Sequence, residues 1–461
     1  MAATLELSPR STLTRFSLGL AAATLLALTG CDGGSSSSTP AASTPPATSA
    51  PAASSSAPAA PASTPAQSSP AETKPVQPAP APPSPPKPAA SAPAPAPAAG
   101  GSILVGHYGS MTGKEATFGQ STDNGIRLAV ADFNALGGFG GRMIALKTYD
   151  TKGESKEAGT AVTRLITDDK VTAVLGEVAS SLSLAGGAVC QEKGVPMITP
   201  SSTNPNVTRG RDYVFRVCFT DDQQAKALAK FVREHLKLTR AAILYDQTQT
   251  YSKGLRDDFT KFMTQMGGTI VSDQAYSGGD QDFSAQLTSI KTAGAEIIFV
   301  PGYYTEGGNI ALQARKLGIE KNVPLLGGDG WDSEQLGAIG GDAIEGCYFS
   351  NHSAPDQPNS DIGKFIDKYK SVYGGATPDA LAGLGYDAAM VLFDSMKRAK
   401  SLAGADLRDA IAATKGYKGI TGVITIDANR NAAKPIVIVQ LKKDAAGKVG
   451  PSYLASIDPT K

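Results

Sequence analysis

The sequence predicts an α/β fold of two lobes, each a parallel sheet covered by helices on both faces. Three observations support this prediction. Short, continuously apolar segments alternate with segments whose apolar residues recur at helical spacing, which is typical of such sheets. The alternation breaks at 204–211 and then restarts. The 360 residues from Ser102 to Lys461 also exceed the size at which one hydrophobic core usually keeps growing.

The first half of this region provides most of the first lobe. Its apolar segments predict strands at 103–105, 143–146, 171–175 and 213–217. Helices are predicted at 126–136, 154–167 and 182–193. Gly137 and Gly138 end the first of these helices, because glycine readily adopts the backbone conformation that terminates a helix.

The second half repeats the pattern and then adds a remainder. Helices are predicted at 225–236, 251–266, 283–290 and 311–317, and strands at 241–245, 270–271, 297–300 and 323–326. The remainder offers helices at about 359–372, 379–399 and 405–413, and strands at about 423–426 and 435–441. We expect it to complete both lobes, so that lobe 1 comprises 102–219 with 350–421, and lobe 2 comprises 220–349 with 422–461.

A three-strand hinge follows from this division, because the chain must pass between the lobes three times. The passages are expected at 218–221, near 348–352 and near Thr421. The two lobes are therefore expected to be Rossmann-like and to close over a ligand between them.

The N-terminal residues predict a secretory signal. Arg10 and Arg15 precede an apolar run at 16–28, which is too short for an ordinary transmembrane helix. The run ends in Leu-Thr-Gly-Cys at 28–31, which resembles the lipobox of bacterial lipoproteins. That resemblance implies a signal peptide at 1–30 and a lipidated Cys31 that anchors the protein to a membrane. The alternative is an ordinary signal peptide whose cysteine is incidental.

Residues 31–101 predict a linker that does not fold. Nineteen of the 31 prolines lie between Ser35 and Gly100, with Ala, Ser and Thr making up almost everything else. Such a segment has too few large apolar side chains to offset the entropy of ordering. Alternating Ala-Pro and Pro-Pro favour an extended, semi-rigid spacer.

The charge balance argues against a nucleic-acid partner. The chain has 43 basic and 42 acidic residues, and four and three of these lie in the first 101 residues. The region that follows is therefore neutral overall and offers no charge excess to displace counterions from phosphates.

Polar residues that follow the predicted strands are the candidate ligand-binding residues, because open parallel sheets bind ligands beyond the carboxyl ends of their strands. In lobe 1 these positions hold Ser180 at the start of a helix, followed by Ser201 and Thr203. In lobe 2 they hold Tyr251 and Tyr303, together with the acid Asp329. Hydroxyls and a helix N-terminus suit a carboxylate, whereas an acid suits an ammonium group. The set predicts a small zwitterionic ligand.

The same region resembles the type I periplasmic binding proteins of branched-chain amino-acid transporters, the leucine/isoleucine/valine-binding family. The resemblance covers about 102–461. Its motifs are Met-Thr-Gly at 111–113, Asn-Ala-Leu-Gly-Gly at 134–138, Tyr-Asp at 149–150, Gly-Val-Pro-Met-Ile-Thr-Pro at 194–200, Tyr-Ser-Lys-Gly at 251–254 and Gln-Ala-Arg at 313–315. It implies the two-lobed fold and the function of an extracytoplasmic solute receptor.

The resemblance also implies roles for the lobe 1 residues. Ser180 would hold the ligand carboxylate through its hydroxyl and backbone N–H. The carbonyl of Ser201 and the hydroxyl of Thr203 would hold the α-ammonium and help to orient the carboxylate. Phe118 occupies a position where the family often has a tyrosine beside the ligand side chain.

In lobe 2, the resemblance implies that Tyr251 and Tyr303 close over the ligand while Asp329 pairs with the ammonium. Three departures from the leucine-binding prototype leave side-chain specificity open. Asp329 replaces a glutamate, and an extra residue lies between Asp246 and Tyr251. A cysteine pair of the prototype is also missing, because this region holds residues such as Lys152 and Ala179.

The partners implied are a free amino acid and the permease subunits of an ABC importer, with membrane contact through the lipid anchor alone. We expect a monomer that is not an enzyme and needs no cofactor. Alternatives are a receptor for an amide, urea or an aromatic carboxylate, and a sensory subunit. An enzyme on the same scaffold is a further alternative, although no acid–base pair or cofactor loop follows any predicted strand.

The histidines and cysteines yield weaker predictions. His107, His235 and His352 lack the spacing of a metal site, and we expect them at surface or loop positions. With Cys31 lipidated, three thiols remain and allow at most one internal disulfide. We favour Cys190–Cys218, and three buried unpaired thiols are the alternative.

Overall fold

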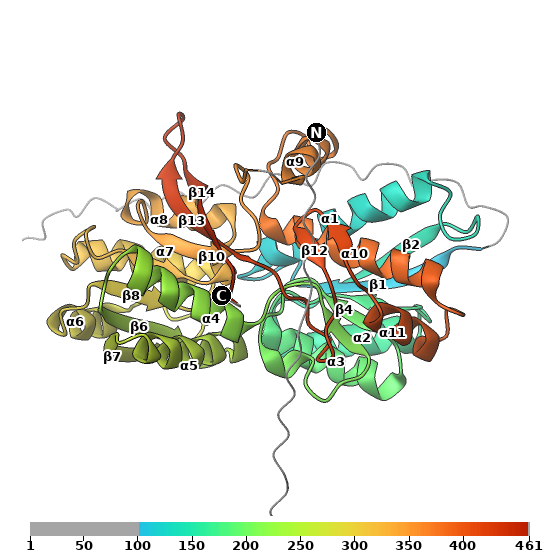
Figure 1. Cartoon of the computed structure of the whole chain (residues 1–461), viewed down its shortest axis with the longest axis horizontal. Coiled ribbons are helices and arrows are strands. Elements are labelled where there is room, and N and C mark those ends of the chain that lie inside the picture. The colour runs from blue at the N-terminus through green and yellow to red at the C-terminus, as the bar shows by residue number, and fades with distance from the viewer. Residues whose placement is uncertain (1–100, 359, 460–461) are drawn as a thin grey trace, which may run out of the picture. The chain divides into compact units, whose positions relative to one another are not determined.

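The computed structural model describes residues 101–358 and 360–459, all of which lie in one compact unit, Ser84–Lys461. The predicted signal peptide at 1–30, Cys31 and nearly all of the linker lie outside the described residues. Within the described part, two sheets with helices on both sides form the two lobes (Figure 1). The predicted α/β fold is confirmed.

The first sheet is entirely parallel, with strand order β2-β1-β3-β4-β5. Its strands are β1 (Ile103–Gly109), β2 (Ile144–Asp150), β3 (Val174–Leu175), β4 (Met197–Thr199) and β5 (Val214–Arg216). The helices of this lobe are α1 (Ala116–Ala135), α2 (Ser155–Thr167), α3 (Ser180–Lys193), α9 (Ile362–Val372), α10 (Ala380–Arg398) and α11 (Gly404–Ala412).

The second sheet has seven strands in the order β14-β13-β10-β9-β8-β6-β7, of which the last five are parallel. They are β6 (Arg240–Asp246), β7 (Thr269–Tyr276), β8 (Ile297–Val300), β9 (Leu325–Gly327), β10 (Tyr348–Asn351), β13 (Ile436–Lys443) and β14 (Val449–Ile457). The helices are α4 (Asp221–Lys230), α5 (Thr250–Gln265), α6 (Ser284–Thr292), α7 (Tyr304–Lys316) and α8 (Glu334–Gly340).

Short elements complete the described chain. They are the strands β11 (Tyr417–Gly419) and β12 (Gly422–Ile424), the 3-10 turns η1 (Pro205–Val207), η3 (Asp329–Trp331) and η4 (Gly341–Ala343), and the π-helical turn η2 (Phe231–His235). Of these, η3 follows β9 at the carboxyl edge of the second sheet.

The helix pair α1 and α10 packs unusually closely in the first lobe. A Cβ atom on Gly125 would lie 1.9 Å from the carbonyl oxygen of Ala382, and one on Gly385 would lie 2.6 Å from that of Thr122. Glycine is therefore required at both positions for the two backbones to touch. This contact fixes the start of α10 relative to α1, and both helices contribute to the site described below.

The chain passes between the two sheets after β5, after β10 and before β13. The third passage differs from the expected one near Thr421. Arg430 bonds to Asp212 and its carbonyl accepts from the N–H of Arg216, so this stretch still belongs with the first sheet. The chain leaves for the second sheet only at 433–435, just before β13 begins. The remaining lobe boundaries stay predictions.

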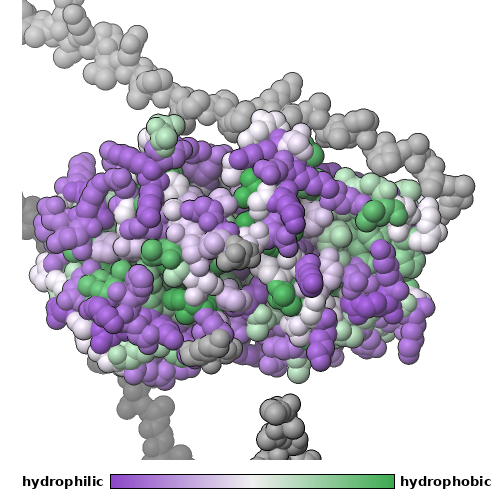
Figure 2. All heavy atoms as spheres, turned by 45° about the horizontal axis from the view of Figure 1, so that its top comes forward, coloured by the Kyte–Doolittle hydropathy of each residue, from purple (hydrophilic) through white to green (hydrophobic). Residues whose placement is uncertain are grey.

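The outer surface is mostly polar. Figure 2 shows hydrophilic side chains over much of one face, with hydrophobic side chains in smaller areas. The strongly exposed large hydrophobic residues of the described chain lie in different segments: Leu136, Leu312, Val372 and Val423. Within 101–358 and 360–459, no helix combines the length and apolarity that a membrane crossing requires.

Candidate ligand-binding site

The seven predicted site residues converge on one small cavity. Its lining consists of these seven and three further residues: Phe118, Val178, Ser180, Ser201, Thr203, Tyr251, Tyr303, Asp329, Gly330 and Leu381. Both lobes contribute, from the carboxyl edges of their sheets. The cavity measures about 10 Å³, close to the room that a single water molecule needs. An amino acid therefore requires the lobes to part before it can enter.

Ser180 is the first residue of α3 and lines the cavity. The first N–H groups of a helix have no partner within the helix itself. The loop before Ser180 is braced by Glu177, which is 1% exposed. The Glu177 carboxylate accepts from the N–H of Ala179 at 2.7 Å and from the hydroxyl of Ser110 at 2.7 Å. Burial raises the pKa of Glu177, although the bond from Ser110 opposes this effect. The hydroxyl of Ser180 accepts from the N–H of Asn204 at 3.3 Å, which leaves its proton free to be donated.

The segment that carries Ser201 and Thr203 is held in shape by Arg216, a fully buried side chain at the end of β5. Its guanidinium donates to the carbonyl of Ser202 at 2.5 Å and to that of Asn204 at 2.8 Å. These two carbonyls are turned toward Arg216, and the alternate residues, Ser201 and Thr203, line the cavity instead. Arg216 thus positions these two candidate residues without lining the cavity itself.

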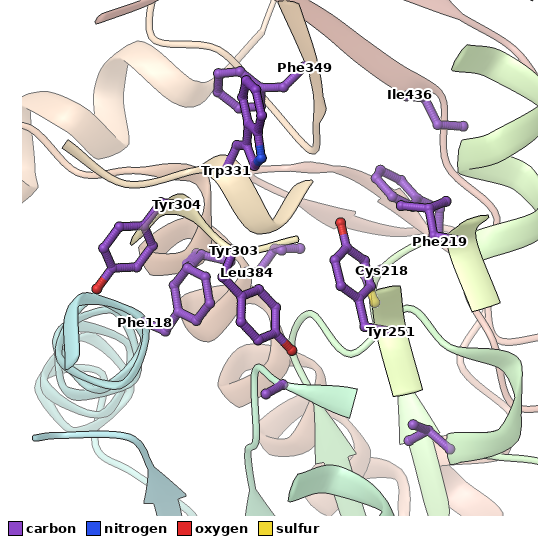
Figure 3. Close-up of a cluster of buried hydrophobic side chains, with 14 of the residues drawn as sticks. Phe118, Cys218, Phe219, Tyr251, Tyr303, Tyr304, Trp331, Phe349, Leu384 and Ile436 are labelled. Carbon is purple, nitrogen blue, oxygen red and sulfur yellow. The ribbon is translucent and has the colours of Figure 1, made fainter. Parts of the chain in front are cut away.

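Aromatic rings from both lobes form one wall of the site (Figure 3). The ring of Phe118, from α1, meets that of Tyr303 edge to face at 5.4 Å between centroids. Tyr303 stacks on Tyr251 at 5.7 Å with an interplanar angle of 7°. Such a wall favours the apolar part of a ligand. Val178 and Leu381 add aliphatic surface.

The acid Asp329 begins η3 and is 5% exposed. One carboxylate oxygen accepts from the amide of Gln224 at 2.8 Å and from the hydroxyl of Tyr251 at 2.9 Å. The other oxygen lies 3.1 Å from Nε2 of His352. Burial raises the pKa of Tyr251 well above its usual value, and the charge of Asp329 adds to the effect, so the phenol stays a donor. Asp329 is therefore fixed from three sides.

Two hydroxyls that line the cavity have no hydrogen-bond partner in the described structure. They are Oγ of Ser201 in lobe 1 and the phenol oxygen of Tyr303 in lobe 2. Buried polar groups are normally satisfied, so unsatisfied ones facing a cavity point to a polar ligand.

The lobes contact each other around the cavity. Ser181 Oγ bonds to the side-chain oxygen of Gln249 at 3.0 Å, and the Tyr304 hydroxyl donates to the carbonyl of Lys114 at 2.7 Å. Thr117 and Ser333 join their hydroxyls at 3.0 Å. The site is thus described with its two sides closed together.

A larger cavity, of about 460 Å³, lies beyond the turn that follows Asp329. Trp331 and Asp332 line it, together with the N-terminus of α10, and none of the seven predicted residues does. The turn and the start of α10 therefore separate it from the candidate site.

Sequence reasoning missed three residues that line the cavity, Val178, Gly330 and Leu381. It also missed two residues that hydrogen-bond to Asp329, Gln224 and His352. Gln224 belongs to the first turn of α4, in the same sequence segment as an apolar helical stripe. The expectation that the histidines occupy surface or loop positions was wrong for His107, which lies inside β1 and is 1% exposed. His352 does occupy a loop position, in the bend after β10, although it is only 3% exposed. His107 bonds to Asp123 at 3.0 Å inside lobe 1. No group of residues in the described chain is arranged to hold a metal ion.

The favoured disulfide, Cys190–Cys218, is not formed. All three described cysteines are free and buried, which agrees with the alternative prediction of three unpaired thiols. Cys190 lies near the end of α3, whereas the thiol of Cys218 faces the carbonyl of Ser202 at 3.5 Å.

Two α/β lobes that close over a small cavity, with polar groups from both, define a ligand receptor of the two-lobed binding-protein class. Residues 102–447 match the family model described as periplasmic binding protein. The chain belongs to this family, which confirms the resemblance seen in the sequence.

Similar proteins with names support the same family. The Leu/Ile/Val-binding protein BraC3 of Rhizobium johnstonii is 38% identical over 267 residues, 58% of this chain and 72% of that protein. The leucine binding protein LivK of Thermotoga maritima has a TM-score of 0.72 at 38% identity, over 78% of this chain and 99% of that one. LivJ of Streptococcus pneumoniae, solved with isoleucine, has a TM-score of 0.71 at 32% identity, over 77% and 99%.

Proposed function

We propose that this protein is an extracytoplasmic receptor that binds a neutral amino acid between its lobes and delivers it to an ABC importer. The names of its relatives support a branched-chain amino acid as the ligand. Binding, not catalysis, is the proposed activity.

The observation that carries the proposal is the polar asymmetry of the cavity. Lobe 1 supplies the α3 N-terminus with Ser180, Ser201 and Thr203, which suit a carboxylate. Lobe 2 supplies the buried acid Asp329, which suits an ammonium group. A zwitterion satisfies both sides at once.

The ligand side chain would then lie against the apolar part of the lining. Phe118, Val178, Tyr303 and Leu381 offer no charged group to pair with a charged ligand side chain. Tyr303 also presents its unsatisfied hydroxyl to the cavity, which allows one polar contact. This lining favours an apolar or small neutral amino acid.

The proposed setting is the outer side of a membrane. The sequence at 28–31 supports lipid attachment at Cys31, and the linker would separate the two lobes from the membrane. Lobe closure would create the surface that the permease recognises, because a ligand that contacts both lobes stabilises the closed state.

The test is a thermal-shift screen of the purified full chain against amino acids, amides and small carboxylates, followed by calorimetry. A neutral apolar amino acid is expected to raise Tm. At 100 times its Kd it should add about 2.7 kcal/mol to the free energy of unfolding. Stabilisation by carboxylates without an ammonium group, and not by any amino acid, would contradict the proposal.

A further inference from the structure

His352 connects the candidate ammonium site to the passages between the lobes. It follows β10 directly, on the second passage, and its Nε2 lies 3.1 Å from the Asp329 carboxylate. Its ring stacks on Phe219, on the first passage, at 4.0 Å between centroids and an interplanar angle of 19°. The acid of the site is thus joined to two hinge segments through one imidazole.

The hydrogen bonds of His352 indicate a neutral ring. A carboxylate only accepts hydrogen bonds, so Nε2 must carry the proton that it donates to Asp329. Nδ1 is buried and has no partner in the described structure. A proton on Nδ1 would be a buried, unsatisfied donor, which is costly. Burial also lowers the pKa of His352, although the bond to Asp329 opposes this effect.

The charged groups that face His352 are few. Asp329 is the acidic one, from η3. Lys434, from the segment before β13, is 3% exposed, and its charge further disfavours an imidazolium. The stacked Phe219 is apolar and adds no charge.

We propose that neutral His352 is a positioning residue for ammonium recognition, and that its protonation competes with the ammonium group of the ligand for Asp329. This inference rests on the proposed amino-acid function. The neutral ring aims the Asp329 carboxylate without reducing its charge. An imidazolium would instead provide Asp329 with an internal cation, so amino acids would bind less tightly in acid.

The competition has a definite sign. A bound ammonium beside Asp329 repels a proton on His352, and by linkage that proton weakens ligand binding. The effect therefore develops below the ordinary pKa of histidine and reaches at most about tenfold per pH unit. A ligand with a carboxylate but no ammonium does not compete, so its affinity is spared.

The experiment is calorimetry of the full chain with L-leucine and with 4-methylpentanoate, which has the leucine skeleton without the ammonium, at about pH 7.5 and about pH 5. H352Q places an amide donor near the position of Nε2 but cannot be protonated. H352F keeps the stacked ring and removes the donor. H235Q is the matched control, because His235 also stacks on a phenylalanine, Phe231, but lies on the surface away from the cavity.

We expect wild type and H235Q to lose leucine affinity at the lower pH. H352Q should bind leucine about as tightly as wild type at the higher pH, without that extra loss in acid. H352F should bind leucine about 10- to 100-fold more weakly, as expected for a lost bond to a charged group, with 4-methylpentanoate little affected.

Several outcomes would overturn the inference. They are an H352Q profile as acid-sensitive as that of wild type, a flat wild-type profile, wild-type leucine affinity in H352F, or equal losses for both ligands. The melting temperature of each variant separates misfolding from a binding effect, and H352Q keeps the test valid if H352F does not fold. If wild type binds no amino acid at all, the proposed function fails as well, which distinguishes that result from the others.

Discussion

Asp329 illustrates how a single carboxylate can be prepared for a ligand. It is nearly fully buried, and every one of its side-chain partners is a hydrogen-bond donor from lobe 2 or the hinge. Three donors hold its geometry, whereas no lysine or arginine forms a salt bridge with it in the described chain. An ammonium from the ligand would therefore supply a cation that the protein does not.

The first prediction concerns D329N. The amide keeps the size of the side chain but removes the negative charge, so a bound amino acid would bury an unpaired ammonium. We expect leucine affinity to fall at least about 100-fold, because breaking a buried charge pair costs about 3–5 kcal/mol. Calorimetry measures the loss. D342N is the control, because Asp342 is an exposed acid paired with Lys443. The leucine affinity of D342N should equal that of wild type.

Unchanged leucine binding by D329N, with an intact fold by circular dichroism, would remove Asp329 from the proposed site. A fall of similar size in D342N would indicate a general effect of charge and would not support a specific pairing.

Single residues of the site differed in how well the sequence revealed them. Ser180 follows the strand predicted at 171–175, whereas Ser201 and Thr203 follow β4, for which no strand range was predicted. Position and the family resemblance together identified these residues as candidates. Gln224 and His352 were missed because their roles depend on contacts far along the chain. Gln224 reaches Asp329 across 105 residues, and His352 depends on a hinge whose path the local pattern does not fix.

At the scale of elements, the buried strand β8 was easier to predict than the edge strands β7 and β14. The strand β8 is buried at all four residues and reads as an apolar run. The edge strand β7 extends to Tyr276, well beyond the predicted 270–271. The prediction was too short because polar residues follow Val271 and interrupt the apolar run. The other edge strand, β14, was not predicted and contains Pro451, which an edge strand tolerates because that residue needs no ladder bond on its open side.

The first helix also begins earlier than its apolar pattern predicted. The apolar stripe predicted the first helix from 126, whereas α1 begins at Ala116. Its first turns carry Phe118 and glycines that serve the site and the contact with α10, so they lack the stripe of a helix that only covers a sheet.

The second prediction concerns that helix contact. G125A would place a Cβ 1.9 Å from the carbonyl oxygen of Ala382, so α1 and α10 must separate. We expect the free energy of unfolding to fall by about 1–3 kcal/mol. G159A is the matched control, because Gly159 lies inside α2 with nothing within 4 Å of a Cβ. It should stabilise the protein by about 0.4–1 kcal/mol.

Chemical denaturation of both variants measures the two effects. If both glycines respond alike, helix propensity and not backbone contact sets the cost, and the close packing of α1 on α10 would be wrong.

At the scale of the whole molecule, the sequence predicted two lobes and the sheets that form them, because alternation of elements is a strong signal. It placed the third passage too early, since residues 426–432 have no apolar run to show that they stay with lobe 1. Their contacts are polar, as in the bond between Thr208 and Asn431.

The third prediction concerns the thiols of Cys190, Cys218 and Cys347. Because they are free and buried, we expect a reductant to leave Tm unchanged, and alkylating reagents to label these cysteines only in denaturant. Burial raises the pKa of Cys218 to about 12, which suppresses its thiolate. Mass spectrometry of the labelled peptides measures this, and a linked Cys190–Cys218 peptide before reduction would contradict it.

The unsatisfied hydroxyls of Ser201 and Tyr303 have a consequence for energy use by an importer. If closure is the signal that starts ATP hydrolysis, each vacant receptor that closes would trigger a futile cycle. A buried polar group left unbonded costs about 1–3 kcal/mol, which reduces the closed population about fivefold to about 150-fold. The two unbonded hydroxyl oxygens would therefore lower the population of receptors that close without a ligand.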